Sequence, residues 1–460
     1  MNDFADWLSP IIVKELRQGM RARAFIGIFL AIQFFMIFVV LISLTNDSGS
    51  REAVTGLFWT VVGAAILFAM PLRGLATLIG EIKGNTLELM LLTRLSAWRV
   101  TAGKWLALML QTLLLFCAVL PYVVLRYFLG GVNLIEDLTS LGWMLAGSAL
   151  LTALAVGLSP FTQSTVVRIG LGFGMLLSLT VIPEMFLGAR MGGGSGFPAM
   201  STCLWAAALL GPLLVLELFE LGVAKIAPAA ENHATRKRVI ATVILAIAVL
   251  LGRARHGSEF FLTLAAITLV PIGLGALMEE TVAIQSLYRP FVRRKMFGRL
   301  AGKLLYPGWA SGLLFFIVIV AAFLWTAHLN WSDGAVRFRV ASGLEAIFAP
   351  LALVRLFFRR AKNILPFYFG LQLVLFVMAI ILTSALDNKD PLLVTAALMP
   401  TIGFFLQLWG NQVIWGSNML SNPTGSGLVV TAVCLLILFI LSLKQWKIIG
   451  TMEREAAALE

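Results

Sequence analysis

The sequence predicts an all-α polytopic membrane protein, and its composition and the length of its apolar runs carry that prediction. Hydrophobic residues make up 60% of the 460 residues and charged residues only 13%, and the mean hydropathy is +0.94. Soluble domains have about 45–50% apolar and about 25% charged residues. Since so apolar a chain could not cover its surface with polar groups in water, the composition excludes a soluble globule, a disordered chain, a disulfide scaffold and a coiled coil.

Apolar runs long enough to cross a bilayer follow one another along the chain, since a spanning helix needs about 20 mostly apolar residues. The candidate spans are 24–44, 54–76, 104–129, 138–160, 165–188, 200–224, 239–252, 259–284, 309–329, 340–358, 364–386, 391–415 and 427–443. The run at 239–252 is short for a span, and Pro400 with several polar residues interrupts 391–415. We therefore expect about 12 transmembrane helices (12–13).

Basic residues gather between the apolar runs, at 14–23, 236–238, 293–303 and 359–362. If the N-terminus is cytoplasmic and the spans alternate, most Lys and Arg residues before residue 386 lie on the cytoplasmic side, as the positive-inside rule requires. This distribution predicts a cytoplasmic N-terminus and favours a cytoplasmic C-terminus. The lipid bilayer, and not nucleic acid, is the expected partner of the net charge of +12.

Residues 9–23 predict an amphipathic helix on the inner membrane surface. Ser9 can cap this helix and Pro10 suits its first position, while apolar residues recur at helical spacing opposite the charges. One interpretation is an anchor for the first span, and the other is an interfacial gating helix that moves with that span. The residues of the gating interpretation are Lys14, Glu15, Arg17 and Arg21.

A cytoplasmic segment, 80–104, separates the second span from the third, although a connection in a helix bundle needs only a few residues. Its first part reads as a short helix with Leu87, Met90 and Leu91 on one face, and Ser96 can cap the helix that enters the third span. Such a short helix can dock in a groove on a partner protein. The alternative is an elbow that lies in the membrane interface.

Two motifs stand out, one before the first span and one after the second. The residues that carry them are Lys14, Glu15, Leu16, Arg17, Glu81, Gly84, Thr86, Leu87, Glu88, Leu89, Leu91, Leu92, Thr93, Leu95, Ser96, Gly103 and Lys104. Together they resemble the ABC-2 type permeases, the membrane subunits of ABC exporters, over about residues 9–230. Arg94 departs from the pattern, because the family often has proline there.

The resemblance implies a permease subunit of an ATP-driven exporter in the bacterial inner membrane, working by alternating access. The segment after the second span would be a coupling helix that contacts a separate ATPase subunit. The contact residues are then Glu81, Leu87, Glu88, Met90, Leu91 and Arg94. ATP and Mg²⁺ are expected on that partner and no cofactor on this chain, because the chain has no G-x-x-x-x-G-K-[ST] loop. We therefore expect no enzyme activity from the chain alone.

Acidic residues in apolar runs keep a second hypothesis open, an ion- or proton-coupled secondary transporter. Glu217 and Glu220 stand three positions apart on one face of the sixth span, and charges inside a membrane are costly and often mark a pathway. An intramembrane enzyme is disfavoured, because neither G-x-S-x-G nor HExxH occurs, and the isolated cysteines and histidines predict no metal site.

The chain is expected to divide near residue 230. Residues 1–230 would form a six-helix ABC-2-like unit, and residues 231–460 a second transmembrane unit of about six helices with no family assigned. Two arrangements stay open: the halves form a pseudo-dimer, or the chain pairs with a second permease copy. Nothing in the sequence identifies the substrate.

Overall fold

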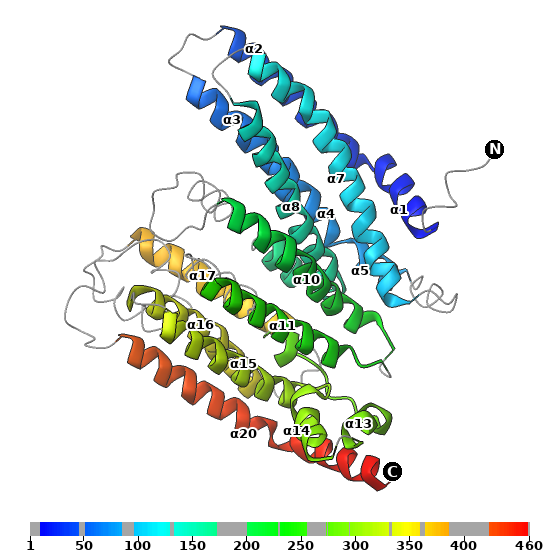
Figure 1. The fold of residues 1–460 in the computed structure, drawn as a ribbon, viewed down its shortest axis with the longest axis vertical. Coiled ribbons are helices and arrows are strands. Elements are labelled where there is room, and N and C mark those ends of the chain that lie inside the picture. Colours follow the sequence, from blue (N-terminus) through cyan, green and yellow to red (C-terminus); the bar gives the residue numbers. More distant parts are fainter. Residues whose placement is uncertain are drawn as a thin grey trace. The chain divides into compact units, whose positions relative to one another are not determined.

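The computed structural model of the chain is built from helices, and the residues that it describes contain no strand (Figure 1). Those residues are 10–45, 51–84, 96–128, 133–172, 200–228, 231–254, 273, 275–293, 295–330, 334–358, 364–385 and 423–458. The prediction of an all-α chain is confirmed.

Seven of the described helical stretches are long and apolar enough to cross a bilayer. They are Arg23–Leu44, Val54–Lys83, Ala97–Phe128, Leu134–Phe161, Trp309–Thr326, Leu365–Leu382 and Ala432–Ala458. The expected spans 165–188, 259–284 and 391–415 lie wholly or largely outside the described residues. The total of about twelve therefore stays a prediction.

Three further expected spans form helices that are not among these seven. They are α10 (Met200–Ile226), α11 (His233–Ala254) and α16 (Gly334–Phe357). Helix α11 is longer than the short apolar run at 239–252, because it begins at His233 and includes the basic residues 236–238.

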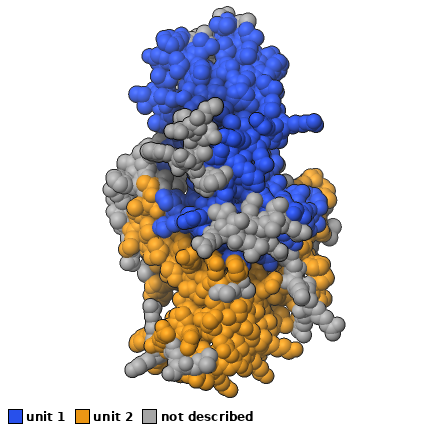
Figure 2. Space-filling model, turned by 90° about the vertical axis from the view of Figure 1, so that its right-hand side faces the viewer, with its two compact units in different colours: residues 1–191, 211–227 blue, residues 192–210, 228–460 orange. Residues whose placement is uncertain are grey.

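The contacts within the chain define two compact units, drawn in separate colours in Figure 2. Unit 1 comprises residues 1–191 and 211–227, and unit 2 comprises residues 192–210 and 228–460.

Unit 1 is a helical bundle whose second span changes its type of helix along its length. Its helices, besides the end of α10, are α1 (Pro10–Arg21), α2 (Arg23–Thr45), α3 (Arg51–Gly63), α4 (Met70–Gly74), α5 (Thr77–Lys83), α7 (Ala97–Phe128) and α8 (Leu134–Leu158). Helix α7 packs on both α1 and α8, and α4 also packs on α8. The interior near α2 and α3 is apolar and includes Met36, Phe58 and Val119.

The second span, expected at 54–76, is helical without a gap over residues 51–74, but the type of helix changes within it. Pro71 has no N–H to donate to the preceding turn, and a π-helical turn over Ala64–Ala69 adjoins α4. The chain then turns at Leu75, whose carbonyl accepts a hydrogen bond from Ser159 Oγ at 3.0 Å. Ser159 Oγ in turn accepts a hydrogen bond from the N–H of Leu78 at 2.9 Å. Helix α5 is thus a separate short helix, and Ser159, which follows α8, hydrogen-bonds to its first turn.

The described part of unit 2 contains α11 and α16, introduced above, and five further helices. They are α13 (Gln285–Val292), α14 (Lys295–Leu305), α15 (Trp309–Asn330), α17 (Leu365–Ala385) and α20 (Pro423–Ala458). Helix α20 has 36 residues, so it is about 54 Å long and exceeds the bilayer core of about 30 Å. Its C-terminal end packs on α13, where Ile449 and Ala456 contact the buried Leu287 (Figure 1).

Candidate functional site

The candidate site lies in unit 1, where the amphipathic helix α1 packs against the start of α7. Helix α1 is described from Pro10 on and buries Ile11 and Ile12, while Ser9, its predicted cap, lies outside the described residues. Gly103 of α7 permits the close approach, because a Cβ atom there would stand only 3.0 Å from Cγ2 of Ile11. The helix therefore packs on protein as well as forming the entry to the first span.

The centre of the site is the ammonium group of Lys104 on α7. Its Nζ atom lies 2.8 Å from Glu15 Oε1 on α1 and 3.2 Å from Glu81 Oε1 on α5. Lys14 Nζ lies 4.0 Å from the same Glu81 oxygen. We call Lys104, Glu15, Glu81 and Lys14 the ionic cluster. It joins three helices that are distant in the sequence.

Three members of the ionic cluster are sheltered from solvent, whereas the Lys14 side chain is 49% exposed. The Lys104 side chain is 3% exposed, and those of Glu15 and Glu81 are 17% and 16% exposed. A buried charge is costly unless it is paired, and removing one partner of such a pair leaves the other uncompensated. The two carboxylates therefore hold Lys104 in place, and Lys104 in turn holds α1 and α5 together.

A second set of polar contacts joins α1 to α4, the last helix of the second span. Arg73 of α4 donates to Gln111 Oε1 on α7 at 2.6 Å and to the carbonyl of Gly19 on α1 at 3.3 Å. Its guanidinium also lies 5.4 Å from the ring centroid of Phe25. Gly19 lies close to Gln111, because a Cβ atom at Gly19 would overlap the side-chain amide of Gln111 unless that amide moved.

A hollow of about 220 Å³ lies between these two sets of contacts. The residues that line it are Glu15, Gln18, Gly19, Arg73, Thr77, Lys104, Ala107, Leu108 and Gln111. Its polar lining and its size allow a few water molecules. Such a hollow leaves room for α1 to shift against α7 without first creating a void.

The segment that the sequence marks as the coupling helix follows α5 directly and precedes α7. Its residues Leu87, Glu88, Met90, Leu91 and Arg94 lie outside the described part of the chain. Its far end is described: Ser96 Oγ accepts a hydrogen bond from the N–H of Arg99 at 3.3 Å, so the predicted cap of the helix entering the third span is confirmed. The ionic cluster thus stands on both helices that flank this segment.

Some other residues predicted for the gating helix and the ATPase contact lie elsewhere than expected. Arg17 and Arg21 are exposed on α1 and belong to neither polar contact described above. Glu81, expected to face a partner, contacts Lys104 of its own chain.

Glu217 and Glu220 are 2% and 3% exposed on α10. Beside them, Phe219 packs edge-on against Trp105 of α7, and Gly157 of α8 meets the backbone of Leu218 so closely that a Cβ atom would overlap its carbonyl.

Sequence reasoning assigned no role to a second buried cation, Arg238 of α11 in unit 2. Arg238 is 1% exposed and donates to the carbonyl groups of Leu304, Tyr306 and Gly308 at 2.6, 3.0 and 3.1 Å. Its Nη2 also lies 2.5 Å from Glu279 Oε2. The arginine therefore fixes the turn between α14 and α15, and only its place in a basic triplet beside an apolar run could have marked it.

Glu279 balances two cations, since Lys237 Nζ lies 2.5 Å from its other oxygen. A buried carboxylate is stable only when it is paired, so the two cations stabilise the charge of Glu279. The N–H of Gly308, a residue with φ of +144° that favours glycine, also donates to it at 3.4 Å.

Comparison with known proteins adds no relative. No protein-family model matches the chain, and searches of curated proteins and of solved structures found no similar protein. The functional argument therefore rests on the sequence motifs and on the geometry of the site.

Proposed function

We propose that the chain is the permease subunit of an ATP-driven exporter resembling the ABC-2 type, and that a separate ATPase subunit supplies the energy. One observation carries the proposal. The two motifs behind the resemblance meet at one atom, since Glu15 of the first motif and Glu81 of the second both bind Lys104 Nζ. Such a contact between the two motifs is expected if movement of the coupling helix is passed on to the first span.

The geometry gives this movement a direct path. Force applied to residues 85–95 enters α5 through Gly84 and α7 through Ser96, because these residues flank the segment. Lys104 passes the displacement to α1, which leads through Ala22 into α2, the first span. A bundle whose first span shifts with α1 can exchange inward and outward openings by small sliding of packed helices.

We place the protein in the cell (inner) membrane with both termini in the cytoplasm. The support for the C-terminus is its contact with the basic region, where Glu455 Oε2 lies 2.5 Å from Gln285 Nε2 at the start of α13. The tail of α20 therefore shares a side with the basic residues 293–303, which the positive-inside rule assigns to the cytoplasm.

The test is purification of the tagged full-length chain from its native membranes in mild detergent. We expect a P-loop ATPase to co-purify in a fixed ratio and to hydrolyse ATP. The chain freed of that partner should hydrolyse none. If the intact chain purifies from its native membranes without any ATPase, or if the chain alone hydrolyses ATP, the proposal is contradicted.

A secondary transporter is the second candidate, and the burial of Glu217 and Glu220 inside unit 1 is the observation that favours it. The test uses vesicles that contain the chain alone, an imposed pH gradient and a panel of transported dyes. Dye movement that follows the gradient without ATP, and that Glu217→Gln and Glu220→Gln both abolish, would establish this candidate in place of the exporter.

A further inference from the structure

Helix α14 of unit 2 turns its apolar side chains outward. Met296 and Phe297 are 85% and 86% exposed, the highest values among the large apolar side chains that the structure describes, and Leu300 is 62% exposed. The buried side of this helix is formed by glycine instead: a Cβ atom at Gly302 would stand 2.8 Å from Tyr288 Oη on α13. We call Met296, Phe297 and Leu300 the α14 face.

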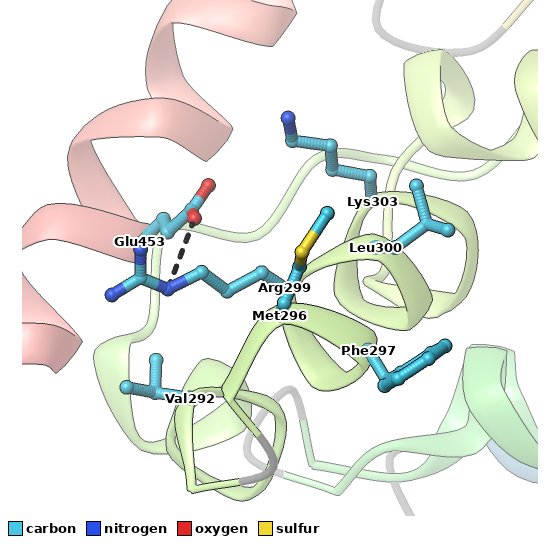
Figure 3. A pocket seen from close by; sticks show the side chains of 7 residues that line it. All are labelled: Val292, Met296, Phe297, Arg299, Leu300, Lys303 and Glu453. Atoms are coloured by element: carbon cyan, nitrogen blue, oxygen red, sulfur yellow. Dashed lines mark ion pairs between the residues drawn. The ribbon is translucent and has the colours of Figure 1, made fainter.

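Positive charge surrounds the α14 face. Residues 285–305 contain six Lys or Arg residues and no Asp or Glu. Arg299 and Lys303 are exposed beside the face. A carboxylate lies close by, since Glu453 Oε1 of α20 is 3.8 Å from Arg299 Nε. Figure 3 shows Arg299 reaching toward Glu453 while Phe297 points away from it.

The face and the charges border one hollow of about 650 Å³ (Figure 3). The residues that line it are Val292, Met296, Phe297, Arg299, Leu300, Lys303 and Glu453. Its position along the chain puts it at the edge of the bilayer, because α14 ends at Leu305 and the candidate span Trp309–Thr326 begins four residues later. A short amphipathic helix at that depth meets both head groups and the first methylene groups of lipid tails.

We propose that the hollow beside α14 binds an anionic phospholipid of the membrane leaflet at this end of unit 2. The phosphate of the lipid pairs with Lys303 and with the outer edge of Arg299, and an acyl chain covers the α14 face. Charge complementarity selects this occupant, because a cationic rim around an apolar face matches an anionic head group joined to an apolar tail. The binding requires a membrane but neither transport nor an ATPase.

The first test measures lipid retention by native mass spectrometry. The detergent-purified full chain is mixed with equal amounts of phosphatidylglycerol and phosphatidylcholine. We expect preferential retention of phosphatidylglycerol, and we expect the double variant Arg299→Gln/Lys303→Gln to lose about thirtyfold in that preference, at about 1 kcal/mol per charge near an anionic surface. The matched control is Lys444→Gln/Lys447→Gln, an exposed basic pair on α20, which removes the same charge and should retain the preference.

The second test locates the α14 face. A nitroxide label is attached at Phe297→Cys in a chain whose Cys117, Cys203 and Cys434 are replaced by alanine, and this chain is reconstituted into vesicles of phosphatidylglycerol and phosphatidylcholine. We expect the label to be more accessible to oxygen than to a water-soluble nickel chelate. Preferential access of the nickel chelate would overturn the proposal and leave the face as a protein-docking surface. Equal phosphatidylglycerol retention by the Arg299→Gln/Lys303→Gln chain and the wild type would also overturn it.

Discussion

Lys104 Nζ and Glu15 Oε1 lie 2.8 Å apart although the two residues are 89 positions apart in the sequence. This contact fastens the amphipathic helix α1 to the start of the third span, and Glu81 adds the helix α5 to the same lysine. The ionic cluster therefore holds together the helices that precede the first span and flank the segment 85–95.

Replacing Lys104 by alanine should strongly destabilise unit 1, because the change leaves Glu15 and Glu81 facing each other without the cation. Breaking a buried ion pair in this way costs about 3–5 kcal/mol. The measurement is thermal unfolding of the purified chain in detergent. Lys83→Ala removes an exposed lysine from α5 and serves as the control, and equal unfolding temperatures for the two variants would show that the ionic cluster contributes no stability.

Gly157→Ala should force α8 away from α10, since the new Cβ atom would overlap the carbonyl of Leu218. The obstacle is backbone and not a flexible side chain, so we expect a loss of at least the roughly 1–3 kcal/mol typical of overpacking. Gly142→Ala on the same helix meets nothing within 4 Å and should be neutral or slightly stabilising. Denaturation curves of both variants test this, and an unchanged Gly157→Ala protein would mean that the two helices are further apart.

Removing the charge of Glu279 should weaken unit 2. Its two carboxylate oxygens pair with Lys237 and Arg238, and Glu279→Gln leaves both cations without that charge. Breaking a buried ion pair in this way costs about 3–5 kcal/mol, so we expect Glu279→Gln to unfold at a clearly lower temperature than wild type in detergent. Equal unfolding temperatures would show that this ion pair contributes no stability.

Thiol labelling tests the topology. Single cysteines are placed at Ile135 near the start of α8, at the exposed Arg293 after α13 and at Arg454 of α20, in a chain without its native cysteines. In intact cells an impermeant reagent should label position 135 and spare positions 293 and 454. If only one of positions 293 and 454 is labelled, the C-terminal end of α20 and the basic region lie on different sides of the membrane. A protected position 135 together with labelled positions 293 and 454 would invert the whole assignment.

Features with a local cause could be predicted from the sequence. The cap at Ser96 depends on residues within one turn, and apolar run length marks most described helices. The contact that fixes the turn after the second span could not be predicted, because the carbonyl of Leu75 binds Ser159, which is 84 positions away.

The partners of Lys104 could not be predicted either. Its sequence context is equally compatible with pairing to Glu15, to Glu81 or to a lipid head group. Polar residues inside apolar runs, such as Arg73 and Gln111, were the available signal for the contacts around it. That signal shows where a polar side chain needs a partner, and only the fold shows which partner it finds.

The most direct test of the proposed function is co-purification of Leu91→Asp with the ATPase. The variant would place an unpaired charge in the groove where the coupling helix is proposed to dock, and losing such an anchor commonly costs about 2 kcal/mol or more, roughly thirtyfold in affinity. We predict that Leu91→Asp inserts normally in a protease-protection assay and no longer retains the ATPase, whereas Lys83→Ala retains it. A normally inserted Leu91→Asp chain that binds and stimulates the ATPase like wild type would contradict the account.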